Sequence, residues 1–190
     1  MMSKSLIFLH GKGADKSAHR VFMDNLAATC QAELVCINAP LSHKSGFSWF
    51  DKRIVGGERV VDEESFNNAV DYVVTRIEGL GIDFRDAILC GHSQGGAVAI
   101  AVSMKQPVRG VISICGDWPS AAKIKTPNAM PDIIWVEGGK DAYLSNERKQ
   151  SYQYLQKAGA NVRYIYDEET EHDIFGPQLL EKIVSHNFIK

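Results

Sequence analysis

Short apolar runs alternate along the chain with longer segments of helical character, and this alternation constrains the fold more than any other feature. Runs of this kind, without strict polar alternation, are typical of strands buried on both faces of a sheet. The six runs are Leu6–Leu9, Glu33–Ile37, Ala87–Cys90, Val111–Cys115, Ile133–Val136 and Val162–Tyr166.

The segments between these runs are predicted to be helices. The segment Gln94–Lys105 is small and apolar nearly all round, so we expect it to form a buried helix. The other predicted helices are Ser17–Cys30, Asp62–Glu78, Ser145–Ala158 and Phe175–Ile183. Strand–helix alternation predicts a mostly parallel sheet of about six strands, with helices on both faces and right-handed crossovers. We expect residues 1–190 to form one α/β domain.

Composition narrows the class of partner. The net charge is −2 and no Lys/Arg cluster stands out, which argues against nucleic acid or an anionic membrane as the main partner. The first apolar run is too short for a signal-peptide core, and no stretch approaches the length of a membrane anchor. The cysteines contain no C-x-x-C pair, which indicates reduced thiols and a cytoplasmic protein. They are Cys30, Cys36, Cys90 and Cys115.

Ser93 is the candidate nucleophile. It lies between a predicted strand and a predicted helix in the segment Gly91-His92-Ser93-Gln94-Gly95, which fits the pattern G-x-S-x-G in the context that this pattern requires. Ligands of parallel sheets bind beyond the carboxyl ends of the strands, where this segment is expected. A Gly-Ser turn without chemistry is the alternative, but both flanking elements favour the nucleophile.

His172 and Asp141 are the candidates for the proton acceptor and for the carboxylate that orients it. Each follows a predicted strand, and the chain order Ser, Asp, His is the one that this motif predicts. Asp117 also follows a strand and stays an alternative to Asp141.

The remaining histidines are weaker candidates. His19 is expected within a helix, His43 in a long loop and His186 near the terminus. His92 is expected to pack beneath the nucleophile.

The segment His10–Gly13 is expected to supply an oxyanion donor through the backbone N–H of Lys12, with Gln94 supplying the second. The segment 11–17 lacks the glycines of a phosphate-binding or dinucleotide-binding loop. The acidic run 168–173 has no second histidine close by, so we expect a solvated loop and no metal site.

The chain resembles the phospholipase/carboxylesterase group of α/β-hydrolases, which includes acyl-protein thioesterases. The resemblance covers most of the chain and rests on five segments: His10-Gly11-Lys12-Gly13, Ala39-Pro40 with Ser48-Trp49-Phe50-Asp51, Gly91–Ala97, Gly138-Gly139-Lys140-Asp141 and Glu171-His172-Asp173. It implies an α/β-hydrolase fold and esterase or thioesterase activity without a cofactor. The sequence departs from the group at His92, where phenylalanine is usual, and at Gly138, where histidine commonly precedes the glycine.

We therefore expect a serine hydrolase that cleaves a small-molecule ester or thioester through an acyl-enzyme. Two alternatives stay open: a non-catalytic binding module on the same fold, and an amide or small-peptide hydrolase with the same residues. Apolar residues that flank the predicted site are expected to line an acyl pocket or to pack in the core. They are Phe47, Trp49, Trp118, Leu144, Ile174 and Phe175.

Overall fold

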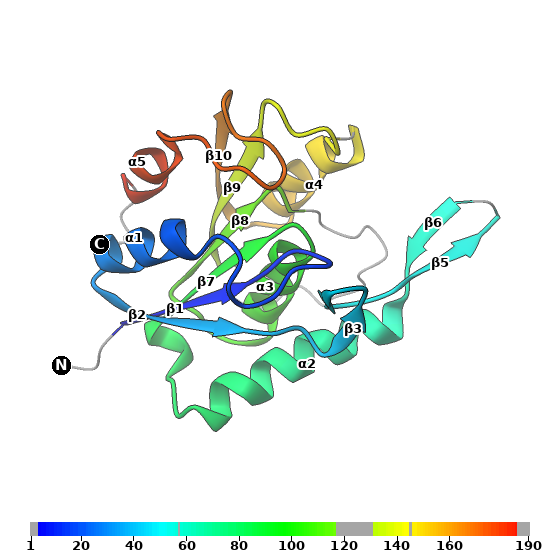
Figure 1. The fold of residues 1–190 in the computed structure, drawn as a ribbon, viewed down its shortest axis with the longest axis horizontal. Coiled ribbons are helices and arrows are strands. Elements are labelled where there is room, and N and C mark those ends of the chain that lie inside the picture. Colours follow the sequence, from blue (N-terminus) through cyan, green and yellow to red (C-terminus); the bar gives the residue numbers. More distant parts are fainter. Residues whose placement is uncertain (1–3, 57, 117–130, 145, 186–190) are drawn as a thin grey trace.

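The computed structural model describes residues 4–56, 58–116, 131–144 and 146–185. They form one six-stranded sheet with helices packed on it (Figure 1). The strand order is β10-β9-β8-β7-β1-β2 and every neighbouring pair is parallel. All six predicted strands are confirmed. Their bounds are β1 (Lys4–Leu9), β2 (Ala32–Ile37), β7 (Ala87–His92), β8 (Gly110–Ile114), β9 (Asp132–Gly138) and β10 (Asn161–Asp167).

Helices cover both faces of the sheet, as predicted. One face packs against α2 (Glu63–Gly79), α3 (Gln94–Lys105) and α4 (Asn146–Lys157). The opposite face packs against α1 (Arg20–Cys30) and α5 (Leu179–Val184). Eleven of the twelve residues of α3 are buried, since the helix lies between α2 and the sheet. This burial explains why α3 has no polar face in the sequence.

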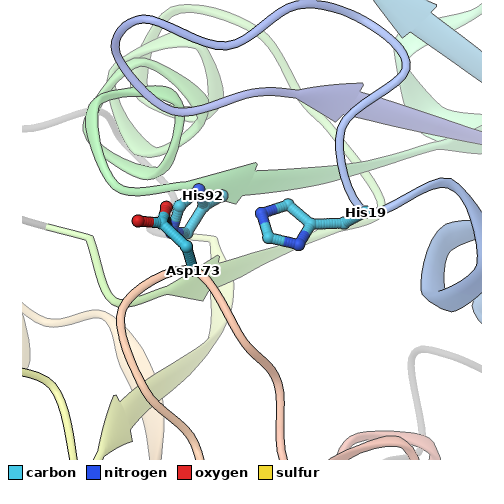
Figure 2. A group of neighbouring side chains, drawn as sticks. All are labelled: His19, His92 and Asp173. Atoms are coloured by element: carbon cyan, nitrogen blue, oxygen red, sulfur yellow. Dashed lines mark ion pairs between the residues drawn. The ribbon is translucent and has the colours of Figure 1, made fainter.

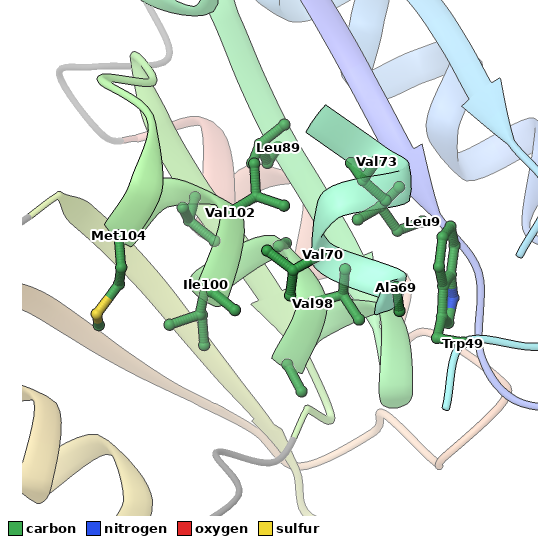
Figure 3. Close-up of a cluster of buried hydrophobic side chains, with 14 of the residues drawn as sticks. Leu9, Trp49, Ala69, Val70, Val73, Leu89, Val98, Ile100, Val102 and Met104 are labelled. Atoms are coloured by element: carbon green, nitrogen blue, oxygen red, sulfur yellow. The ribbon is translucent and has the colours of Figure 1, made fainter. Parts of the chain in front are cut away.

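The core on the α3 side fixes the elements that carry the nucleophile (Figure 3). Leu9 of β1, Leu89 of β7 and Val98 of α3 are fully buried in one cluster. Each such side chain contributes about 1.5–3 kcal/mol to stability through its burial. The start of α3 and the ends of β1 and β7 are therefore held in one packed unit.

Two predicted helices begin later than expected. The helix α1 begins at Arg20 because His19 takes a left-handed conformation with φ 53°, so His19 lies before the helix and not within it. The helix α5 begins at Leu179, because Gly176 and Pro177 interrupt the predicted segment. A residue before proline is disfavoured in the α region. Phe175 therefore belongs to the loop after β10.

The region 41–61 contains two hairpins that the sequence did not predict. The first pairs β3 (Leu41–His43) with β4 (Gly46–Ser48), and the second pairs β5 (Lys52–Val55) with β6 (Glu58–Val61). The second hairpin projects from the body of the molecule (Figure 1). A short 3-10 helix, η1 (Phe84–Asp86), precedes β7.

All four cysteines are free thiols, as predicted, and three of them are buried. Burial raises the pKa of the Cys30 thiol to about 11, so this group is not ionised near neutral pH. Among the described helices, none combines the length and the apolar character that a membrane span needs.

Candidate active site

Ser93 occupies a sharp turn between β7 and α3. Its backbone has φ 51° and ψ −117°, a conformation that costs a residue with a side chain of the order of 1–3 kcal/mol. Two glycines make the turn possible, because a Cβ on Gly91 would lie 2.2 Å from the Gly95 carbonyl oxygen, and one on Gly95 2.1 Å from that of Leu9. The Ser93 N–H donates to the Ile114 carbonyl at 3.0 Å. The neighbouring strand β8 therefore holds the strained turn.

The loop that carries His172 is folded around the buried carboxylate of Asp167, at the end of β10. This carboxylate accepts hydrogen bonds from the Thr170 hydroxyl at 2.9 Å and from the Lys182 ammonium of α5 at 2.7 Å. Burial alone would raise the pKa of Asp167, but these hydrogen bonds and the Lys182 charge outweigh burial and lower it. Thr170 Oγ1 accepts in turn from the Gly176 N–H at 2.8 Å. Both ends of the loop are thus tied to Thr170 and Asp167.

The loop after β9, which carries Asp141, is hydrogen-bonded to the loop after β10. The Gly139 N–H donates to the Asp167 carbonyl at 2.8 Å, and the Lys140 N–H donates to the Thr170 carbonyl at 3.1 Å. Because both bonds join main-chain groups, the backbone itself sets the spacing between the two loops.

Ser93, His172 and Asp141 form one hydrogen-bonded chain. His172 Nε2 lies 3.1 Å from Ser93 Oγ, and His172 Nδ1 lies 3.0 and 3.1 Å from the two carboxylate oxygens of Asp141. The Asp141 side chain is 0% exposed and that of His172 is 16% exposed. Asp141 also accepts from the Tyr143 N–H at 2.8 Å, which fixes the carboxylate. The alternative carboxylate, Asp117, lies outside the described residues.

The loop after β1 lies against Ser93. A Cβ on Gly11 would be 3.5 Å from Ser93 Cβ. Across the described residues, the backbone N–H groups of Lys12 and Gln94 have no hydrogen-bond acceptor. The Gln94 N–H opens α3, where the helix dipole adds partial positive charge, and the Lys12 N–H belongs to the loop that lies against Ser93.

The His10 ring holds this loop in shape. Its Nδ1 lies 2.7 Å from the Gly11 carbonyl oxygen, and its Nε2 accepts from the Ala39 N–H at 3.0 Å. Since a carbonyl only accepts and an N–H only donates, these partners assign the Nδ1–H tautomer. Burial lowers the pKa of His10, which favours the same neutral ring. The Trp49 indole N–H donates to the His10 carbonyl at 2.7 Å.

The Gln94 side chain joins the start of α3 to the segment after β4. Its Oε1 accepts from the Ser48 hydroxyl and from the Trp49 N–H, both at 3.1 Å. Its Nε2 donates to the Phe50 carbonyl at 2.9 Å. This contact gives a physical reason for the joint occurrence of Ser93-Gln94-Gly95-Gly96 and Ser48-Trp49-Phe50-Asp51 in the sequence.

Two of the residues predicted to line an acyl pocket have packing roles. Of the two roles expected for Trp49, pocket lining and core packing, its 0% exposure fits packing, and its indole N–H donates to the His10 carbonyl. Phe175 stacks on the His19 ring with the centroids 4.1 Å apart and packs against the core that includes α1 and α5.

The other predicted pocket residues differ in exposure. Phe47 and Leu144 are half-buried, and the Phe47 ring lies 6.4 Å from the ring of His10. Ile174 is 62% exposed, two residues after His172. Trp118 lies outside the described residues.

Sequence reasoning missed two neighbours of His172. The exposed Tyr143 ring meets the His172 ring edge-on at 4.7 Å between centroids, and only its position two residues after Asp141 hinted at this contact. Cys115, which has a left-handed φ of 50°, places its thiol 3.8 Å from the Glu171 carbonyl oxygen. No sequence pattern marks that contact.

Two groups of three side chains in the described part of the chain bring metal-ligand types within 4.8 Å of one another. They are His19, His92 and Asp173, and Cys115, Asp141 and His172. In the second group, Asp141 and His172 already bond each other and the thiol faces a carbonyl. The first group includes His92, the residue directly before Ser93.

A strained serine after β7, a carboxylate after β9 and a histidine after β10, on a parallel sheet covered on both faces, are features of α/β-hydrolases. The sequence model of the phospholipase/carboxylesterase family matches residues 2–188, and the chain belongs to this family. The resemblance found in the motifs is thereby confirmed. Membership of the family points to an esterase-type hydrolase.

Solved structures with a similar fold include SOBER1 from Arabidopsis thaliana, with 23% identity and a TM-score of 0.75 over 98% of this chain and 97% of that one. The carboxylesterase from Mesorhizobium loti has 20% identity and a TM-score of 0.76 over 96% and 87% of the two chains. The Bacillus cereus carboxylesterase has 17% identity and a TM-score of 0.75 over 96% and 86%. At these identities the likeness establishes the α/β-hydrolase fold. No curated protein matched the sequence.

Proposed function

We propose that the protein is a serine hydrolase that cleaves carboxylic esters or thioesters through an acyl-enzyme, with Ser93, His172 and Asp141 as its catalytic residues. The observation that carries the proposal is the position of one imidazole. The ring of His172 lies within hydrogen-bond distance of the Ser93 hydroxyl on one side and of the Asp141 carboxylate on the other.

In the first half of the reaction, Ser93 Oγ attacks the acyl carbonyl carbon while His172 Nε2 takes the hydroxyl proton. The buried carboxylate of Asp141 stabilises the imidazolium that forms. The imidazolium then gives the proton to the leaving oxygen or sulfur, and the bond between that atom and the acyl carbon breaks. An ester now joins the acyl group to Ser93.

In the second half, water replaces the leaving group. The water oxygen attacks the acyl-enzyme carbonyl while His172 takes a proton from that water. His172 then gives the proton to Ser93 Oγ as the acid departs. Each half passes through a tetrahedral oxyanion. The N–H groups of Lys12 and Gln94 are the donors that we assign to it, and loss of one such donor typically costs about a hundredfold to a thousandfold in turnover. These steps need no cofactor.

The substrate is a small molecule in this proposal, and exposed apolar surface beside the base is its contact area. Ile174 and Tyr143 are both largely exposed; the Tyr143 ring meets the His172 ring edge-on, and Ile174 follows His172 by two residues. These two side chains, rather than Trp49, are the residues that we assign to substrate contact.

A panel of chromogenic esters from acetyl to palmitoyl, with matched thioesters and amides, tests the function and identifies the acyl group. We expect ester or thioester turnover by the wild type and a loss of about a millionfold in kcat for Ser93→Ala, because the three residues act as a unit. Near-wild-type turnover by Ser93→Ala would overturn the proposal. Turnover of the amides alone would show that the protein is an amide hydrolase that uses the same three residues.

A further inference from the structure

His92, the residue before Ser93, makes a contact that the proposed reaction does not use. Its ring is 2% exposed, and its Nε2 lies 2.7 Å from the backbone carbonyl oxygen of His172. Its Nδ1 is buried without a hydrogen-bond partner and lies against Gly11, since a Cβ on Gly11 would come within 2.7 Å of it. One nitrogen of this ring is thus engaged and the other is not.

The surroundings of the two ring nitrogens assign the protonation state of His92. A carbonyl oxygen only accepts, so Nε2 carries the proton, and the lone pair is on the enclosed Nδ1. Burial, together with the neighbouring rings of His19 and His172, lowers the pKa of His92 to about 3. His92 is therefore a neutral hydrogen-bond donor across the physiological pH range.

This state argues against a metal site in the group His19, His92 and Asp173. Figure 2 shows these side chains gathered from the segment before α1, the end of β7 and the loop after β10. Asp173 Oδ1 is 3.9 Å from His92 Nε2, beyond hydrogen-bond distance. That nitrogen has no lone pair for a metal while it donates to the carbonyl. The hydrogen bond from His92 Nε2 to the His172 carbonyl, and not a metal ion, therefore explains the orientation of the His92 ring.

The hydrogen bond joins the strand of the nucleophile to the loop of the base. The side chain of His172 is hydrogen-bonded to Asp141, and the main-chain carbonyl of His172 is hydrogen-bonded to His92. The His92 ring is itself confined, because Phe175 meets it edge-on at 5.6 Å and His19 does so at 4.7 Å between centroids. We infer that His92 is a positioning residue, which sets the place of His172 relative to Ser93 through the Nε2–H···O=C bond. This inference rests on the proposed function of His172.

Two nearly isosteric substitutions separate the hydrogen bond from packing. His92→Gln keeps an N–H donor at about the position of Nε2, whereas His92→Met fills a similar volume without a donor. A displacement of about 1 Å in catalytic geometry costs about a hundredfold, so we expect His92→Met to lower kcat by about 10- to 100-fold with KM unchanged. We expect His92→Gln to restore kcat to within about threefold of the wild type, because its donor can re-form a neutral hydrogen bond of similar strength.

Kinetics on the full chain with the best ester of the panel, together with melting temperatures, distinguish the outcomes. Equal losses of kcat in both variants, or wild-type kcat in His92→Met, would overturn the inference. Failure of the wild type to hydrolyse any ester or thioester would instead overturn the proposed function. Long-range ¹⁵N–¹H NMR of the histidine rings gives a readout independent of activity. One ring should stay in the neutral Nε2–H form from pH 8 to 5 and lose its signals in His92→Gln, and an Nδ1–H form for that ring would contradict the inference.

Discussion

Two histidines, His92 and His172, lie beside Ser93 with their ring centroids 5.0 Å apart, and the two imidazole rings have different roles. His172 is partly exposed, sits on a loop and faces a buried carboxylate. His92 is buried at the end of a strand and faces a backbone carbonyl. The carboxylate beside His172 stabilises the imidazolium that the proposed reaction forms, whereas burial and the neighbouring rings of His19 and His172 lower the pKa of His92 and keep its ring neutral. The surroundings of each ring, and not its hydrogen-bond partner alone, therefore decide which one is suited to carry a proton.

Replacing Asp141 by Asn would make His172 resemble His92, because the ring would then face a neutral partner. We expect Asp141→Asn to lower kcat by about ten-thousandfold, since an amide no longer stabilises the imidazolium and favours the wrong tautomer. Steady-state kinetics between pH 7 and 9 measure the effect. Circular dichroism should match the wild type. A loss below about tenfold would show that Asp141 is not the partner on which His172 depends.

The two regions also differ in what supports them. His172 depends on a loop folded around the ionised Asp167, whereas His92 ends the buried strand β7. We expect Asp167→Asn to reduce the free energy of unfolding at pH 7 by about 1–3 kcal/mol, through the loss of hydrogen bonds to a charged group. Urea unfolding at several pH values measures this quantity.

The sign of the pH dependence follows from the lowered pKa of Asp167. The stabilisation by the ionised carboxylate is complete above the unfolded value of about 3.9. It is lost as the pH falls through the lower pKa of the folded state. The difference between wild type and Asp167→Asn should therefore shrink below about pH 4. A difference that stays constant down to pH 2 would show that the charge of Asp167 does not support the loop.

The sequence was sufficient for the sheet and for the placement of Ser93 and His172, because these depend on local patterns, and it offered Asp141 with Asp117 as an alternative. Apolar runs mark buried strands, and the residues after β7, β9 and β10 meet at one edge whatever the loops do. The resemblance between motifs also gave the correct family. The elbow of Ser93 was predictable because its glycines are required by close main-chain contacts.

The remaining features depend on contacts between distant residues, which periodicity does not encode. The role of Trp49 depends on the His10 carbonyl, 39 residues away in the chain, and that of His92 on a carbonyl 80 residues away. The strands of the two hairpins are only three or four residues long, too short for a clear pattern. The helix α5 begins later than its apolar spacing indicates, because Gly176 and Pro177 interrupt the segment.

The most direct test of the account is covalent labelling with a fluorophosphonate probe, followed by peptide mass spectrometry. An activated serine attacks phosphorus and displaces fluoride, so the adduct identifies the nucleophile without knowledge of the substrate. We predict one adduct, on Ser93, that forms rapidly in the wild type and is absent in Ser93→Ala. No adduct in the folded wild-type protein, or an adduct on a different residue that persists in Ser93→Ala, would contradict the account.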